Sequence, residues 1–110
     1  MIRLEGQRFV ELAKVVDYLL NAEHADGGSK SAFFTRFGFD RDRPEELLDA
    51  LASHPDRNAV VSVAISPFGS KSVVECRIDT PDGRNPCIRT VWIREGDASP
   101  HRLVTAYPLP

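Results

Sequence analysis

The sequence lacks the features that mark membrane proteins, secreted precursors and strongly basic nucleic-acid-binding proteins. No apolar run approaches the roughly 20 residues that cross a bilayer, and the first residues contain an acidic side chain but no apolar stretch typical of a signal peptide. The net charge of −2 gives no overall attraction to RNA or to an anionic membrane. We therefore expect a soluble cytoplasmic protein, or a delivered module of a larger one, without membrane contact; any RNA site would be a local patch.

Cysteine is also scarce. The two cysteines, Cys76 and Cys87, are too few for a disulfide framework, and no cysteine–histidine spacing resembles a zinc site. Both lie in strand-like runs, where a free thiol behaves as a small apolar residue. The sequence therefore predicts two structural free thiols, no bound metal and no cofactor.

The first half of the chain has the spacing of helices, in a single domain expected over residues 1–110. Helices are predicted at residues 11–21, 29–37 and 42–54. Ser29 is suited to cap the second helix, and Gly38 to end it in the left-handed conformation. Pro44 suits the first turn of the third helix, and His54 followed by Pro55 is expected to stop it.

The second half changes to the pattern of strands, with turn residues between them. Strands are predicted at residues 59–65, 72–79, 87–95 and 102–107. The first is β-branched and continuously apolar, so it is expected to be central and well covered. The predicted fold class is α+β, with two to three N-terminal helices packed on one face of a four-stranded antiparallel sheet.

The register of the central hairpin follows from its turn. With Asp82-Gly83 as a two-residue loop, Glu75 faces Thr90, which shares a mixed sheet face with Trp92. A bulge after this loop would exchange Arg89 and Thr90 between the two faces, and this alternative stays open. A mixed face of this kind is either a solvated surface or a binding surface.

Motifs spread over most of the chain resemble those of a bacterial domain family of unknown function, whose members are stand-alone proteins or terminal modules. In this sequence they are Asp17-Tyr18-Leu19-Leu20-Asn21-Ala22-Glu23-His24, Gly27-Gly28-Ser29-Lys30-Ser31-Ala32-Phe33-Phe34, Phe37-Gly38-Phe39, Pro81-Asp82-Gly83-Arg84, Val91-Trp92-Ile93 and Arg102-Leu103-Val104-Thr105-Ala106-Tyr107-Pro108. The layout looks like the fold shared by barnase, the tRNA-cleaving colicins and RelE-like toxins.

The loop between the first two predicted helices holds one candidate site. Cleavage of RNA without a metal ion needs a group that transfers protons and cations that stabilise the phosphorane. His24 could transfer the proton and Lys30 could hold the phosphate, beside an anion nest formed by Ser29 and the start of the helix. The alternative is an ordinary loop in which His24 is solvated or locally bonded. The spacing is not that of a nucleotide-binding P-loop.

A second cluster follows the last two predicted strands. Its members are Arg89, Thr90, Trp92, Thr105 and Tyr107. The arginine could stabilise a phosphate, the threonines could donate hydrogen bonds, and an aromatic ring could stack on a base. The alternative is that Trp92 packs in the core and that Arg89 pairs with Glu75.

Two hypotheses of different classes result. The first is a metal-independent ribonuclease of bacterial toxin type, in which His24, Lys30, Arg89 and Thr105 are catalytic and Ser29, Thr90, Trp92 and Tyr107 bind the substrate. Its partners would be RNA and a neutralising protein. The second is a non-catalytic protein-binding module, such as a toxin–antitoxin partner or an accessory domain of a phage or secreted protein. Convergence of His24, Lys30 and Arg89 in one cleft would favour the first hypothesis.

Overall fold

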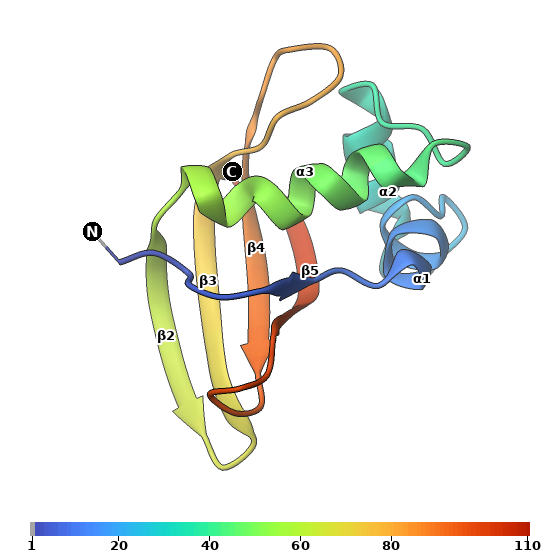
Figure 1. The fold of residues 1–110 in the computed structure, drawn as a ribbon. Helices are drawn as coiled ribbons and strands as arrows, with labels where there is room; N and C mark the ends of the chain where they lie inside the picture. The colour runs from blue at the N-terminus through green and yellow to red at the C-terminus, as the bar shows by residue number, and fades with distance from the viewer. Residues whose placement is uncertain (1) are drawn as a thin grey trace.

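The computed structural model describes residues 2–110, which form an α+β fold with a five-stranded mixed sheet (Figure 1). The elements in chain order are β1 (Arg8–Phe9), α1 (Leu12–Lys14), η1 (Val15–Leu19), α2 (Gly28–Arg36), α3 (Pro44–Arg57), β2 (Val60–Ser66), β3 (Gly69–Arg77), β4 (Cys87–Arg94) and β5 (His101–Pro108). In this part of the chain, no helix has the length and apolar character needed to cross a membrane.

The sheet has the strand order β1-β5-β4-β3-β2, so the prediction of four antiparallel strands is only roughly right. Strands β2 to β5 are antiparallel to their neighbours, as expected, but the short β1 adds a parallel fifth strand beside β5. Two residues give no alternating pattern that a sequence reading can detect. Backbone pairing of Arg8 with His101 and of Phe9 with Arg102 fixes the N-terminal segment across the sheet.

The helical half is less regular than its spacing indicates. The segment predicted as one helix at residues 11–21 is a single α-turn followed by η1, a π-helical turn. Helix α3 crosses the upper half of the sheet (Figure 1) and continues three residues beyond His54, through Pro55 to Arg57. The prediction that His54 and Pro55 stop this helix is therefore wrong. Gly38 follows α2 with a φ of 102°, as its predicted role requires.

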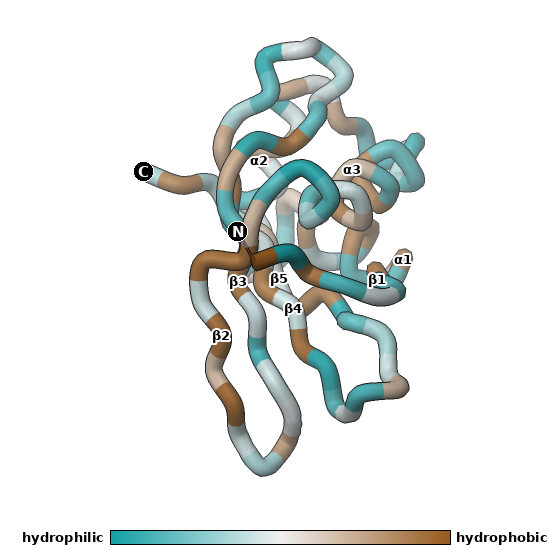
Figure 2. The backbone as a smooth tube through the Cα atoms, turned by 60° about the vertical axis from the view of Figure 1, so that its left-hand side comes forward, coloured by the Kyte–Doolittle hydropathy of each residue, from teal (hydrophilic) through white to brown (hydrophobic). Residues whose placement is uncertain are grey.

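Strand β2 lies at the outer edge of the sheet, which corrects the prediction of a central, covered strand. Its side chains from Val61 to Ser66 are all exposed. The β2–β3 hairpin extends below α3 (Figure 1), and the tube coloured by hydropathy shows β2 as a mainly hydrophobic strand beside a more polar β3 (Figure 2). A continuous apolar run is typical of a buried strand, but here no helix covers it.

The β3–β4 hairpin uses the open alternative in its register. Glu75 faces Arg89 and Val74 faces Thr90, one residue away from the pairing that a two-residue loop would give. The connection is longer than predicted, and Asn85 within it adopts a φ of 49°. As a result Thr90 and Trp92 point into the core, whereas Arg89 lies on the opposite face with Glu75.

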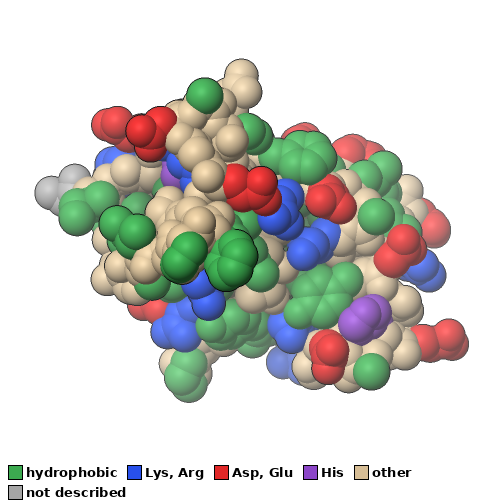
Figure 3. Space-filling model, turned by 90° about the horizontal axis from the view of Figure 1, so that it is seen from below, with side chains coloured by type: hydrophobic (Ala, Val, Ile, Leu, Met, Phe, Trp, Pro, Cys, Tyr) green, Lys and Arg blue, Asp and Glu red, His purple; other side chains and the backbone are tan. Residues whose placement is uncertain are grey.

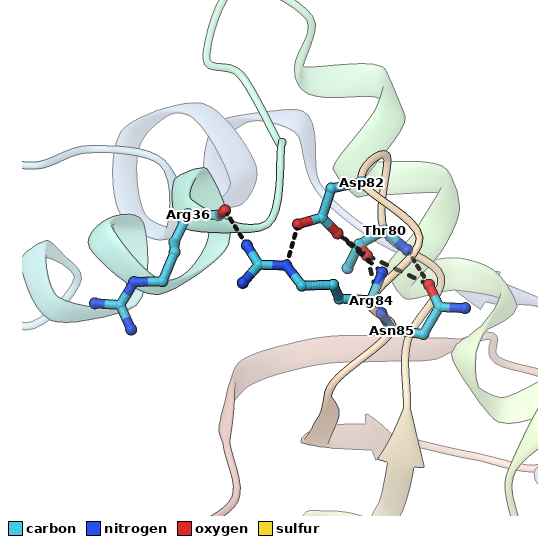
Figure 4. Close-up of polar contacts among 5 residues, drawn as sticks. All are labelled: Arg36, Thr80, Asp82, Arg84 and Asn85. Atoms are coloured by element: carbon cyan, nitrogen blue, oxygen red, sulfur yellow. Dashed lines mark hydrogen bonds and ion pairs between the residues drawn. The ribbon is translucent and has the colours of Figure 1, made fainter.

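The hairpin loop at residues 80–85 is bound to the end of α2 (Figure 4). Arg84 donates from Nη2 to the Arg36 carbonyl over 2.8 Å, and its Nε lies 2.6 Å from Asp82 Oδ2. Gly38 approaches Pro81 so closely that a Cβ at Gly38 would lie 3.1 Å from the Pro81 Cβ. Two of the quoted motifs, Phe37-Gly38-Phe39 and Pro81-Asp82-Gly83-Arg84, therefore have a structural role.

The two cysteines are joined in a disulfide, so the prediction of free thiols is wrong. Cys76 on β3 and Cys87 on β4 have Cα atoms 4.1 Å apart and are separated by 11 positions in the sequence. The physical reason is the hairpin itself, which brings the two neighbouring strands together at the base of its loop. The spacing of the two cysteines does not indicate a disulfide by itself. The crosslink can be inferred only from the register of the hairpin.

Candidate functional site

An open cavity lies between the η1–α2 region and the part of β5 that extends beyond its pairing with β1. Its volume is about 530 Å³, and the residues that line it are Lys14, Tyr18, His24, Asp26, Lys30, Val104, Thr105 and Tyr107. Four residues singled out in the sequence therefore meet here: His24 and Lys30 from the loop and helix, and Thr105 and Tyr107 from the last strand. The two groups are about 80 positions apart in the sequence, so the fold creates this proximity.

His24 is oriented by the turn that begins α2. Its ring Nδ1 accepts hydrogen bonds from the backbone N–H groups of Asp26 and Gly27, each over 3.0 Å, and its carbonyl accepts the N–H of Gly28. The backbone N–H groups of residues 26–28 are therefore bound by His24 and are not available to an anion. Since Nδ1 acts as an acceptor, the neutral ring carries its proton on Nε2, which remains available as a donor.

A tyrosine fixes the position of this turn. The rings of Tyr18 and His24 meet edge to face, with centroids 5.0 Å apart. A Cβ at Gly27 would overlap the Tyr18 carbonyl, so only glycine fits at that position. The Gly27-Gly28 pair is thus required for the turn to approach η1, and it brings His24 to the edge of the cavity.

Two lysines supply positive charge on either side of the cavity. The ammonium group of Lys14 donates to the Val104 carbonyl over 2.8 Å, and that of Lys30 donates to the Asp26 carbonyl over 2.9 Å. Lys30 also lies over the Tyr18 ring, 5.3 Å from its centroid. Each ammonium group has further hydrogen atoms with which to bind an anion.

Hydroxyl groups lie between these cations. The Tyr18 hydroxyl is 3.1 Å from Thr105 Oγ1, and Tyr107 continues the row along β5. Arg89 is not part of the cavity lining but adjoins it, because its Nη1 donates to the Tyr107 hydroxyl over 3.0 Å and its Nε binds Glu75. The hydrogen bonds to Tyr107 and then to Glu75 raise the pKa of Arg89 above its ordinary value. The pairing of Arg89 with Glu75, the simpler of its two interpretations, is thus present.

The remaining predicted substrate-binding residues lie elsewhere. Thr90 and Trp92 are fully buried, and the Trp92 Nε1–H donates to Thr90 Oγ1 over 2.9 Å. Neither side chain can contact a substrate in this conformation, because the hairpin register turns both toward the helices. Ser29 is exposed on the first turn of α2 and makes no cap, since Gly27 is the N-cap residue.

Sequence reasoning missed four residues of the cavity, of which three are polar: Lys14, Tyr18 and Asp26; the fourth is Val104. Lys14 and Tyr18 lie in a segment where the apolar stripe alone indicates a helix. Asp26 lies in a sequence that is typical of a turn. A lysine and a tyrosine in a short helix give no signal of their own. For Asp26 the signal was present, because a carboxylate two residues after His24 was already part of the candidate loop.

A protein-family model matches nearly the whole chain. Residues 5–110 match the model of a family described as a domain of unknown function (DUF6883). The chain belongs to this family. No curated protein matches this DUF6883 domain, and within residues 2–110 no group of three or more His, Cys, Asp or Glu side chains is arranged to hold a metal ion.

A solved structure shares the fold of this DUF6883 domain. It is described as a contact-dependent growth inhibition toxin–immunity protein complex from Klebsiella pneumoniae 342. One of its chains aligns with a TM-score of 0.71 over 92% of each chain, at 22% sequence identity. At this identity the similarity establishes the fold alone.

Proposed function

We propose that this domain is a ribonuclease of bacterial toxin type, which cleaves RNA without a metal ion. The observation that carries the proposal is the meeting of His24, Lys30 and Thr105 in one open cavity. RNA cleavage needs residues of these types, and Arg89 lies beside the cavity against the Tyr107 hydroxyl. The toxin–immunity complex with the same fold adds to the proposal, as does the order of helices followed by an antiparallel sheet that barnase, the tRNA-cleaving colicins and RelE-like toxins share.

In the proposed reaction, the 2′-oxygen of a ribose attacks the adjacent phosphorus and the bond from phosphorus to the 5′-oxygen breaks. The products are a 2′,3′-cyclic phosphate and a free 5′-hydroxyl, so one proton leaves the 2′-hydroxyl and one reaches the 5′-oxygen. Lys14 and Lys30 lie where they can stabilise charge on the phosphate oxygens, with Arg89 behind Tyr107. The Tyr18 and Thr105 hydroxyls bond to each other, so one of them keeps its hydrogen free to donate to the same oxygens.

The bonding of His24 suggests its role. Its Nδ1 is occupied as an acceptor, so the neutral ring presents Nε2–H as a hydrogen-bond donor to charge that develops on an oxygen, and it does not release this proton. We therefore place His24 on the side of the leaving 5′-oxygen. Asp26 is the carboxylate that lines the cavity, and in this proposal it accepts the proton of the 2′-hydroxyl and then, as a carboxylic acid, gives it to the leaving 5′-oxygen.

Two substitutions of His24 separate its structural role from its chemical one. Asparagine can still accept the backbone N–H groups of Asp26 and Gly27 through its side-chain carbonyl, whereas alanine cannot. We expect both His24→Asn and His24→Ala to abolish cleavage, and only His24→Ala to lose about 1 kcal/mol of stability. The measurement is cleavage of total bacterial RNA in EDTA with analysis of fragment ends, alongside urea unfolding.

Cyclic-phosphate ends produced by the wild-type domain and absent with His24→Asn would support the mechanism. Full activity in His24→Asn would remove His24 from the chemistry. Intact RNA with a folded wild-type domain would end the ribonuclease proposal.

A neutralising protein would be required by a toxin of this kind. The cavity is bordered by Lys14 and Lys30, so an inhibitor that covers it would present acidic side chains. The second candidate function, a non-catalytic protein-binding module, is favoured by a different observation: the exposed apolar side chains of β2. Intact RNA in the cleavage experiment would shift the proposal to that function.

A further inference from the structure

The outer edge of β2 is an unusually apolar surface for a free strand. Seven large hydrophobic side chains are exposed within residues 2–110, and four of them lie on β2 or its hairpin turn. They are Val61 (54% exposed), Val63 (51%), Ile65 (85%) and Phe68 (81%). The space-filling view onto this end of the sheet shows hydrophobic side chains at the surface (Figure 3).

Apart from a β-bulge between Val60 and Ser62, this edge lacks the usual protection against strand pairing. Free edges in soluble proteins commonly carry a charged residue or an inward-pointing lysine, or are covered by another segment. The twelve residues 59–70 contain no charged side chain, although charged residues make up 27% of the chain. Within residues 2–110, the backbone of β2 makes one hydrogen bond outside its hairpin, from the Val60 N–H to the Ile2 carbonyl.

The pattern of β2 is self-complementary. In an antiparallel pair related by a two-fold axis through Val63 and normal to the sheet, Val63 faces its own copy and Val61 faces Ile65 of the other chain. Ser62 then faces Ala64 on the opposite side of the sheet. Large apolar side chains thus meet on one face and small ones on the other over residues 62–65, with the bulged Val61 at each end of the pairing.

We infer that β2 pairs with β2 of a second copy of this chain, which joins the two five-stranded sheets into one. Charge favours this occupant, because a neutral strand brings no like charges together at the axis and offers no charged group to select a different partner. A single strand pair with its flanking side chains is a small interface, so we expect a dissociation constant on the order of micromolar.

This interface is independent of the proposed ribonuclease site. In the strand order β1-β5-β4-β3-β2, the cavity beside Thr105 lies at β5 and the pairing edge lies three strands away. Dimerisation would therefore leave both cavities open to solvent. Loss of dimerisation and loss of RNA cleavage can be tested separately for the same reason.

The test is sedimentation equilibrium of the full chain over a wide range of concentration. We expect a dimer fraction that rises with concentration in the wild type. Val63→Lys and Val63→Glu place like charges at the two-fold axis and should each raise the dissociation constant by about tenfold or more. Mixing equal amounts of these two variants should restore association, because a lysine then faces a glutamate.

Leu12→Lys is the matched control, since Leu12 is 54% exposed but lies outside β2, and it should associate like the wild type. Ile65→Lys is the second edge variant, at the most exposed of the four positions, in case the Val63 variants do not fold. A wild type that stays monomeric at every concentration would overturn the inference. So would a mixture of the two Val63 variants that stays monomeric, or an Ile65→Lys variant that associates like the wild type.

Discussion

Thr90 and His54 form a chain of hydrogen bonds inside the core, which links the Trp92 indole to the Cys76 carbonyl. Thr90 Oγ1 accepts the Trp92 indole N–H, so its own hydroxyl is free to donate to His54 Nδ1, 2.9 Å away. This leaves the proton of the neutral His54 ring on Nε2, which donates to the Cys76 carbonyl over 2.8 Å. Each of these buried polar atoms has a partner, and only an uncharged His54 satisfies all of them.

Protonation of His54 should therefore destabilise the fold. Burial lowers the pKa of His54, and its hydrogen bond to the Cys76 carbonyl opposes this only in part. The unfolded chain then binds a proton at a higher pH than the folded chain, so the stabilisation is present above the unfolded pKa of about 6.5 and is lost as pH falls toward the folded value. In that window we expect a slope of at most about 1.4 kcal/mol per pH unit from this group.

Urea unfolding of the wild type and of His54→Gln between about pH 7 and pH 5 checks this expectation. The free energy of unfolding of the wild type should fall more steeply than that of the variant. His101, whose pKa burial also lowers, contributes in the same direction in both proteins. Parallel pH dependence in the two proteins would contradict a neutral, buried His54.

At the scale of elements, the sequence predicted the four long strands but not which elements cover them or which of their faces is buried. The continuous apolar run at residues 59–65 specified a strand, because β-branched side chains favour extended backbone. Whether a helix covers that strand depends on α3, which packs over β3 and leaves β2 exposed. The faces of β4 depended in the same way on the loop, because a register one residue away from that of a two-residue loop turns Thr90 and Trp92 into the core.

The β3–β4 hairpin is held at one end by the disulfide, which leads to a prediction about reduction. Crosslinking Cys76 to Cys87 across 11 positions restricts the unfolded chain, by about 2–3 kcal/mol on the chain-entropy account. The bound loop and the strand ladder should keep the reduced hairpin folded. Reduction should therefore lower the free energy of unfolding by about this amount without loss of secondary structure.

Urea unfolding monitored by circular dichroism, with and without a reductant, measures this effect. A Cys76→Ala/Cys87→Ala variant is the control, because its stability should not respond to the reductant. Equal stability of the oxidised and reduced wild type would show that the crosslink restricts little of the unfolded chain.

At the scale of the whole molecule, the α+β class followed from the sequence, whereas the convergence of His24 and Lys30 with Thr105 and Tyr107 did not, because the sequence placed them in two separate clusters. The fold class follows from the order along the chain, in which helices come before strands. The convergence of the four residues depends on which loop and which strand meet, and β5 is the strand beside η1 and α2. Lys14 and Tyr18 could not be assigned from the sequence, because their positions at the cavity depend on packing alone.

Net charge makes the proposed RNA site a local one, and this predicts a weak dependence of binding on salt. The chain carries a net charge of −2, so few counterions are displaced beyond those at Lys14, Lys30 and Arg89. For single-stranded RNA, each phosphate that the protein neutralises contributes about −0.7 to the slope of log K against log salt. We expect a slope no steeper than about −2, and a shallower one because Arg89 is already paired with Glu75.

Fluorescence anisotropy of labelled RNA with His24→Asn, which should bind without cleaving, measures this slope. Adding Lys14→Gln should reduce the slope by about 0.7, whereas Arg57→Gln, which removes a cation far from the cavity, should leave it unchanged. A steep slope that survives loss of Lys14 would place the RNA on another surface.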